Sequence, residues 1–211
     1  MLRVWGRRNS FNVQKVLWLV GELGLPYEHV PAGGSFGRLD DPDFRALNPH
    51  GMIPVVEEDG AALWESHAIL RYLAARHGQG VFWSEDPAAR AVVDGWMEWS
   101  ETALQPPFLQ GLFQGYFRTP EAQRDWPAIR RSQQACAELY GMLDQRLARQ
   151  PFVVGDALSL ADITVGATLY RYYEMDIEKP SLPHLEAYYS RLTERPAYSE
   201  NVMISFAELR G

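Results

Sequence analysis

The sequence predicts an α+β domain followed by an all-helical domain. Strand-like runs end by residue 64, helical spacing of apolar residues dominates after residue 80, and a stretch containing Gly and Pro lies between the two patterns. The 211 residues are enough for one domain or two small ones. We therefore expect residues 1–79 to form the first domain, 80–87 a linker and 88–211 the second domain.

The first domain begins with strand, helix, strand. Leu2–Trp5 is predicted as a strand, and Val13–Leu23 as a helix whose apolar residues lie on two sides. A helix of that kind is expected to be sandwiched between a sheet and another element. Asn12 is a good N-cap for it, and Gly24 precedes a second strand at Tyr27–Pro31.

A hairpin and a helix complete this domain. A short helix is predicted at Asp43–Leu47, then strands at Ile53–Glu57 and Ala61–Trp64. Asp59-Gly60 between these strands favours a tight turn. The next helix is expected from Ser66, with Ser66 as its N-cap. The predicted order is β-α-β-α-β-β-α.

The second domain shows only helical patterns. Ser159 and Asp162 have the spacing of a capping box, which is a structural signal. Cys136 lies on an apolar helical stripe, so it is predicted to be a core thiol. Helices are predicted at Ala88–Leu104, where Gln105-Pro106-Pro107 forms a break, and at Trp126–Arg149, Leu160–Tyr173, Pro183–Glu194 and near Ser199–Leu209.

Composition narrows the function classes. Hydrophobic residues make up 46% and charged residues 22% of the chain, without a run long enough for a membrane span or a signal peptide. The net charge of −7 disfavours nucleic acid and anionic membranes as partners. A single cysteine suggests a cytoplasmic setting, and five histidines without paired ligand spacing predict no metal site.

The order of these elements and two sequence motifs resemble those of a known protein family. The order of elements, the stretch NPHGMIPVVEEDG at Asn48–Gly60 and the stretch WESHAILRYLA at Trp64–Ala74 together resemble the cytosolic glutathione transferases. The likeness is to bacterial members, theta-like or disulfide-reductase-like, and includes the SLADI box at Ser159–Ile163. It implies a thioredoxin-like domain that binds glutathione, a helical bundle that shapes a second-substrate site, and a homodimer.

The resemblance assigns glutathione-binding residues in the hairpin region. It implies that Pro54 follows a cis peptide bond and that the backbone of Ile53 pairs with the cysteinyl backbone of glutathione. Glu65 and Ser66 match the residues that hold the γ-glutamyl end, where a carboxylate meets an ammonium and helix amides meet a carboxylate. From the residues alone, Pro54 can simply begin an edge strand and Ser66 can simply cap a helix.

The catalytic group is expected in the loop RRNSFNVQKV, Arg7–Val16. A hydroxyl or amide that donates to sulfur lowers the pKa of the glutathione thiol. Alignment to the family makes Ser10 the first candidate and Asn12 the second. Both also have purely local explanations, Asn12 as an N-cap and Ser10 as a partner for loop backbone. The loop has no cysteine, which argues against a mixed-disulfide mechanism.

The remaining assignments concern the glycyl carboxylate of glutathione and the second substrate. Met52 stands where many relatives carry a side chain that holds the glycyl carboxylate, so that role passes to His50, Arg38 or Arg7. By family position, the apolar second-substrate pocket is expected to contain Phe11, Phe113, Tyr116 and Phe206, although aromatic residues are usually core.

Three functions follow from these expectations. The first is a glutathione transferase whose thiolate attacks a small hydrophobic electrophile or a peroxide. The second is a glutathione-dependent disulfide reductase without an enzyme cysteine. The third is a non-catalytic interaction module of the same fold, which would not need Glu65, Ser66 and Ser10.

Overall fold

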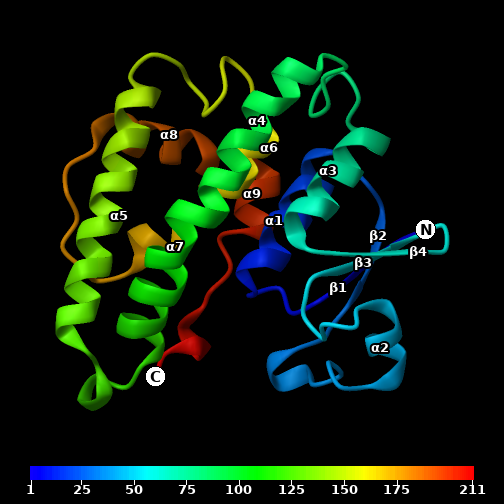
Figure 1. The fold of residues 1–211 in the computed structure, drawn as a ribbon, viewed down its shortest axis with the longest axis horizontal. Helices are drawn as coiled ribbons and strands as arrows, with labels where there is room; N and C mark the ends of the chain where they lie inside the picture. The colour runs from blue at the N-terminus through cyan, green and yellow to red at the C-terminus, as the bar shows by residue number, and fades with distance from the viewer. The chain divides into compact units, whose positions relative to one another are not determined.

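The structure is a computed structural model that describes residues 1–211, and it divides into two compact units (Figure 1). Unit 1 contains Met1–Glu85 and Arg195–Ile204, and unit 2 contains Asp86–Glu194 and Ser205–Gly211. From the sequence, we expected all of residues 88–211 to belong to the helical domain. The segment Arg195–Ile204 departs from that division because it packs with unit 1.

Unit 1 is built on a four-stranded sheet in the order β2-β1-β3-β4. Its strands are β1 (Leu2–Trp5), β2 (Tyr27–Val30), β3 (Val55–Glu58) and β4 (Ala61–Trp64). β1 pairs parallel with β2 and antiparallel with β3, and β3 pairs antiparallel with β4. Asp59 and Gly60 join β3 to β4 with φ of 49° and 85°, as the predicted tight turn requires.

Helices cover both sides of this sheet. The helical elements of unit 1 are α1 (Phe11–Glu22), the 3-10 turn η1 (Gly34–Phe36), α2 (Pro42–Leu47), α3 (Ser66–His77) and α9 (Pro196–Asn201), of which α9 packs on α1. Figure 1 shows α1 and α3 together on one side and α2 on the other, where Phe44 packs with Val55 and Trp5. The predicted order β-α-β-α-β-β-α is confirmed.

The sandwiching of α1 is completed by α9. Arg195, just before α9, donates to both carboxylate oxygens of Glu22 at 2.7 and 2.6 Å. Trp18 on α1 donates to the same carboxylate and packs edge to face against Tyr198 at 4.7 Å. The apolar residues on two sides of α1 thus face the sheet and α3 in one direction and α9 in the other.

Unit 2 is entirely helical. Its elements are α4 (Pro87–Trp99), the π-helices η2 (Ser100–Leu104) and η3 (Pro106–Arg118), the 3-10 turn η4 (Glu121–Gln123), α5 (Trp126–Leu147), α6 (Leu160–Gly166), α7 (Leu169–Glu174), α8 (Pro183–Thr193) and the 3-10 turn η5 (Ala207–Leu209). None of the helices in residues 1–211 is both long enough and apolar enough to cross a membrane.

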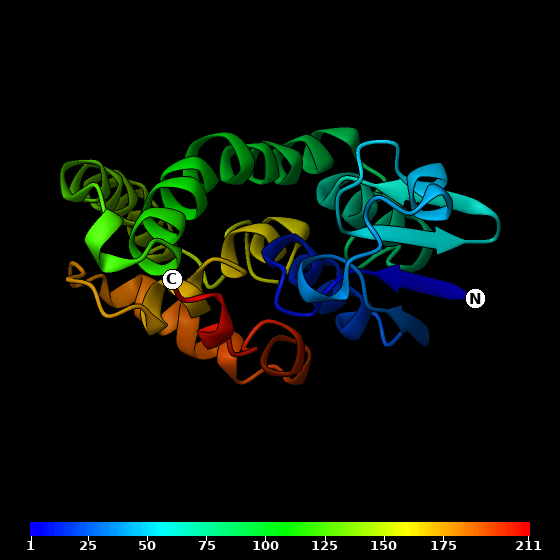
Figure 2. The same cartoon turned by 90° about the horizontal axis from the view of Figure 1, so that it is seen from below.

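The predicted break at Gln105-Pro106-Pro107 is wrong. The helix continues from α4 through η2 and η3, the green run in Figure 2. Prolines lack a backbone N–H and clash with the preceding turn of an α-helix. Here the helix widens into π turns around Pro106 and Pro107 instead of ending.

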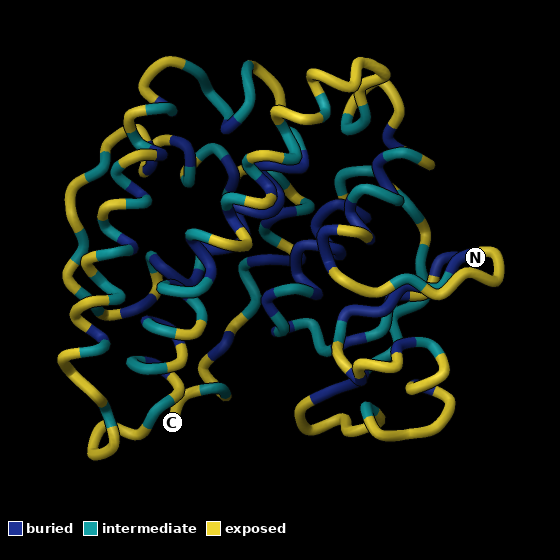
Figure 3. The backbone as a smooth tube through the Cα atoms, viewed as in Figure 1, coloured by how far each residue is buried: buried dark blue, intermediate teal, exposed yellow.

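Other predictions for unit 2 agree with the structure. The capping box of α6 is present, with Ser159 and Asp162 bonded reciprocally. Cys136 is fully buried in the apolar face of α5, and burial raises the pKa of its thiol to about 12. Figure 3 shows the alternation of buried and exposed residues along the helices that such a stripe predicts. The predicted helix Leu160–Tyr173 is interrupted at Ala167-Thr168 into α6 and α7.

Candidate functional site

Unit 1 contains a pocket of about 110 Å³ that gathers most of the predicted glutathione-binding residues. Three parts of unit 1 form it: the first turn of α1, the loop before β3, and the junction of β4 with α3. Its lining residues are Asn12, Asn48, His50, Met52, Ile53, Pro54, Glu65 and Ser66. Residues 12, 53 and 66, far apart in the chain, thus share one small cavity.

The loop before β3 is a fixed wall of this pocket. The Ile53–Pro54 peptide bond is cis. Asn48 is buried, donates through its side-chain amide to the Met52 carbonyl at 2.8 Å, and accepts from the His50 backbone N–H at 2.9 Å. Sequence reasoning missed Asn48. Its signal was the Asn-Pro-His-Gly run, a turn in which an asparagine side chain bonds nearby backbone.

Glu65 and Ser66 occupy positions one residue away from those predicted. Ser66 is the first residue of α3 rather than its N-cap, and it is buried. Glu65 is the N-cap residue, with φ of 67° and no side-chain capping bond. A non-glycine residue in this conformation costs of order 1–3 kcal/mol and is typical of binding sites. Glu65 is exposed and lines the pocket from the N-terminal end of α3.

The start of α1 also differs from its prediction. The helix begins at Phe11 with Ser10 as N-cap residue, so Asn12 lies inside the first turn and is not the cap. Ser10 makes no side-chain capping bond and does not line the pocket. Asn12 does line it, and its side-chain Oδ1 is buried without a hydrogen-bond partner. Such an atom is costly unless a ligand supplies the partner.

Of the three cationic candidates for the glycyl carboxylate, only His50 lines the pocket. Arg38 stacks on the Trp5 ring at 4.9 Å. Arg7 donates to the Asn9 side chain at 2.7 Å. Met52 lies in the pocket wall with 56% of its surface exposed.

The four aromatic candidates are divided between the units. In unit 2, Phe113 and Phe206 are buried against each other with ring centres 5.6 Å apart. Phe206 also lines a cavity of about 180 Å³ with Tyr170 and Arg210. Tyr116 is half-buried and donates to the Asp176 carbonyl at 2.6 Å. Phe11 is buried in unit 1. Their side chains therefore serve packing at least in part.

A buried ion–imidazole contact beside the pocket escaped the sequence reasoning. Lys15 of α1 is fully buried, with its Nζ 3.2 Å from Nε2 of His67. Burial and the neighbouring cations of Lys15 and Arg71 lower the pKa of His67 to about 2. A signal was present: Lys15 is the one charged residue in the run Val13–Val20, which the apolar pattern already predicted to be buried on two sides.

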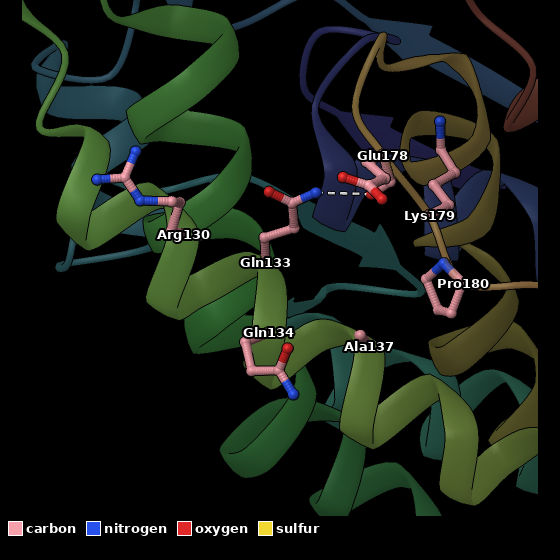
Figure 4. A pocket seen from close by; sticks show the side chains of 7 residues that line it. All are labelled: Arg130, Gln133, Gln134, Ala137, Glu178, Lys179 and Pro180. Carbon is pink, nitrogen blue, oxygen red and sulfur yellow. Dashed lines mark hydrogen bonds between the residues drawn. The ribbon is translucent and has the colours of Figure 1, made fainter.

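A second, larger cavity of about 410 Å³ lies on unit 2, away from every predicted site residue. Arg130, Gln133, Gln134 and Ala137 line it from one face of α5, and Gln133 donates to the Glu178 carbonyl at 2.6 Å (Figure 4). Its lining is mostly solvent-exposed. Size alone therefore does not mark it as a chemical site.

Comparisons with known proteins agree with this architecture. Two family models match: the glutathione S-transferase N-terminal domain over residues 1–75, and the glutathione S-transferase C-terminal domain over residues 104–196. Glutathione S-transferase GstB of Escherichia coli strain K12 is 41% identical, covering 97% of this chain and 99% of that protein.

Solved structures give the same result. The theta class glutathione S-transferase of the citrus canker pathogen Xanthomonas axonopodis pv. citri, with glutathione bound, is 44% identical with a TM-score of 0.91, covering 97% of this chain and 98% of that one. A glutathione S-transferase from Pseudomonas fluorescens is 31% identical with a TM-score of 0.80, covering 93% and 96%. The chain therefore belongs to the glutathione S-transferase family.

Proposed function

We propose that the pocket of unit 1 binds glutathione and that Asn12 stabilises its thiolate for attack on a small electrophile. The observation that carries this proposal is the gathering of Asn12, Ile53, Glu65 and Ser66 around one cavity. Family membership makes the chain an enzyme of the glutathione S-transferase class. The choice of thiolate-stabilising residue and of substrate is the part that we add.

The tripeptide has a matching partner at each end of the pocket. Pairing of β3 with β1 begins at Val55, so the backbone of Ile53 is outside the ladder and suits an extended peptide. At the other end, Ser66 and the first-turn amides of α3 suit the γ-glutamyl carboxylate, and Glu65 suits its ammonium. His50 is the proposed contact for the glycyl carboxylate.

Asn12 replaces Ser10 as our first catalytic candidate. The unpartnered Oδ1 of Asn12 can accept from the thiol S–H, and the amide nitrogen of the same side chain can donate to the thiolate. The first-turn amides of α1 add a positive potential that favours an anion. Ser10 stays the second candidate, since it lies two residues away at the N-cap position.

A second candidate activity is reduction of mixed disulfides by glutathione alone. This activity would run without an enzyme thiol, because Cys136, the chain's single cysteine, is buried in unit 2 and burial raises its pKa to about 12. In this reaction a bound thiolate attacks a disulfide sulfur and the other sulfur leaves as thiolate. The homodimer, the cytoplasmic location and the aromatic second-substrate pocket stay predictions.

Binding and turnover test the proposal together. Calorimetry measures glutathione affinity, and assays with a chloronitrobenzene, a hydroperoxide and a mixed disulfide identify the activity. We expect Asn12→Ala to lower kcat/KM about a hundredfold, the scale for loss of a donor to a developing anion. Ser10→Ala, the matched control in the same loop, should stay within about threefold, since Ser10 makes no capping bond.

Two results would overturn parts of the proposal. Absence of binding at millimolar glutathione would remove the glutathione site altogether. A large loss with Ser10→Ala and none with Asn12→Ala would return the catalytic role to Ser10.

A further inference from the structure

The loop before β3 forms the glycyl end of the proposed glutathione site. The γ-glutamyl end, the sulfur and the cysteinyl backbone are already assigned to the N-terminal ends of α3 and α1 and to Ile53-Pro54. Of the lining residues, this leaves Asn48, His50 and Met52 for the glycine. Asn48 is buried, and both polar groups of its side chain are bonded to loop backbone. The side chains of His50 and Met52 are therefore the ones that meet this end of the ligand.

Met52 makes this end of the pocket apolar and open to solvent. Its backbone carbonyl is held by the Asn48 amide at 2.8 Å, and its side chain lies exposed in the pocket wall. A methionine side chain is flexible and adapts to the shape of what it contacts. Its sulfur is a weak acceptor and offers a carboxylate no donor. Met52 therefore contributes contact area at the glycyl end and no charge.

The charged groups around this end supply only a weak contact for a carboxylate. No lysine or arginine lines the pocket, and its titratable lining residues are Glu65 and His50. Glu65 is an acid and belongs to the γ-glutamyl end. Arg45 packs against the loop, but its guanidinium donates to the Asp40 carboxylate at 2.6 Å and to a loop carbonyl at 3.1 Å. His50 is exposed, and an exposed ion pair changes affinity by at most about fivefold.

The size of the pocket indicates that the glycyl end of the ligand is not enclosed. Its volume of about 110 Å³ is below the roughly 300–1,000 Å³ of sites that enclose a drug-sized ligand, so a tripeptide extends beyond it. The polar groups proposed for the γ-glutamyl end and the sulfur include buried ones, Ser66 and Oδ1 of Asn12. His50 and Met52 are both exposed. The glycyl end is therefore the part that extends into solvent.

We propose that Met52 makes the site insensitive to charge at the glycyl end, so that glutathione derivatives whose glycyl carboxylate is blocked as an ester or amide are also substrates. The inference rests on the proposed glutathione site and deepens it, because it names the class of thiol that the site accepts. The reaction itself is unchanged. With a chloronitrobenzene, the sulfur forms the new bond to the ring carbon, chloride leaves and the thiol proton goes to solvent.

Two modified glutathiones test this proposal on the full-length protein. Glutathione ethyl ester is blocked at the glycine, and N-acetylglutathione is blocked at the γ-glutamyl amine. We expect kcat/KM for the ester to stay within about fivefold of that for glutathione in the chloronitrobenzene assay. For the N-acetyl compound it should fall at least about tenfold, because a charge-assisted contact to Glu65 is lost. A loss above about fivefold with the ester, or equal losses with both compounds, would overturn the proposal.

The variant Met52→Lys tests whether Met52 sets this property. The new ammonium gives a free glycyl carboxylate a partner and gives the ester none. The ratio of kcat/KM for glutathione to that for the ester should therefore rise at least about threefold above the wild-type ratio. Because both thiols are compared on each protein, intrinsic differences between them cancel. Met142→Lys, the same substitution at an exposed methionine of α5 in unit 2, is the matched control and should leave the ratio unchanged.

These outcomes are distinct from a failure of the proposed function. A folded Met52→Lys protein with an unchanged ratio would overturn the role of Met52 while the glutathione site stands. If Met52→Lys does not fold, Met52→Arg takes its place in the same comparison. Wild-type protein that turns over glutathione and rejects the ester would overturn this inference alone. Wild-type protein that binds no glutathione would overturn the proposed function and this inference with it.

Discussion

The first turns of α1 and α6 start alike and differ in how their polar groups are used. Each helix follows a serine, Ser10 before α1 and Ser159 before α6. In α6, the buried Asp162 carboxylate is satisfied within unit 2 by four hydrogen bonds, from Val153 N, Ser159 N, Ser159 Oγ and Tyr188 OH.

In the first turn of α1, by contrast, the polar side chains are not fully hydrogen-bonded. Ser10 makes no capping bond, and the buried Oδ1 of Asn12 lacks a partner. Buried polar atoms are nearly always hydrogen-bonded, so an exception at a pocket wall indicates a place kept for a ligand. The comparison leads us to expect that a helix end whose polar groups are all bonded serves stability, and that one with an unbonded polar atom at a pocket wall serves binding.

Removal of Asp162 should give the largest effect on stability. Asp162→Ala leaves the buried donors of Val153 and Tyr188 and the two part-buried donors of Ser159 without this acceptor, and we expect the free energy of unfolding to fall by about 4 kcal/mol. Urea denaturation measures the loss. Asp156→Ala, an exposed aspartate in the same loop, is the matched control and should change stability by less than about 0.5 kcal/mol. An equal loss of stability in both variants would contradict the interpretation that the hydrogen bonds of Asp162 at the start of α6 stabilise the fold.

The first turn of α3 contains a buried histidine, His67, whose titration should make the stability of the protein depend on pH. The folded-state pKa of His67 is about 2, below the unfolded value of 6.5. Below pH 6.5 the unfolded chain therefore binds a proton that the folded chain does not. Stability from this group is complete above pH 6.5 and falls as pH drops, by about 2 kcal/mol between pH 7 and pH 5.

The variant His67→Gln isolates that effect. It removes the titrating group, so its stability should fall less than that of the wild type over the same pH range, by about 2 kcal/mol. Chemical denaturation at pH 7, 6 and 5 gives both curves. Parallel curves would show that His67 titrates alike in the folded and unfolded chain.

Local patterns could be predicted from the sequence because their chemistry is contained in a few neighbouring residues. The Ser159–Asp162 box and the Asp59-Gly60 turn are examples, and both are present in the structure. Element boundaries were less accurate. α1 begins at Phe11, two residues before the predicted Val13, and its N-cap residue is Ser10 instead of Asn12.

What escaped prediction depends on contacts between distant residues. The Lys15–His67 contact joins positions 52 residues apart, and no single run of sequence encodes it. Likewise, Ser10 and Asn12 are equally polar in the sequence, and only the cavity distinguishes the residue that lines it. The residues that the family resemblance assigned to glutathione in the hairpin region, Ile53, Pro54, Glu65 and Ser66, line one pocket. The resemblance ranked Ser10 above Asn12, whereas of these two residues only Asn12 lines that pocket.

The smallest expected effect on stability is that of Asn12→Ala, and it tests the difference between the first turns of α1 and α6 most directly. Without glutathione, Asn12→Ala should raise the free energy of unfolding by about 0.5 kcal/mol, because alanine removes an unpartnered buried acceptor and favours the helix. Asn9→Ala is the matched control. Asn9 accepts from Arg7 at 2.7 Å, so its loss should cost about 1 kcal/mol.

Opposite signs for these two asparagines, measured by urea denaturation, are what an open helix end predicts. Destabilisation of similar size in both would mean that Asn12 supports the fold like any paired polar residue. A gain in stability joined to the loss of turnover would instead show that the first turn of α1 gives up stability to keep a binding position for sulfur.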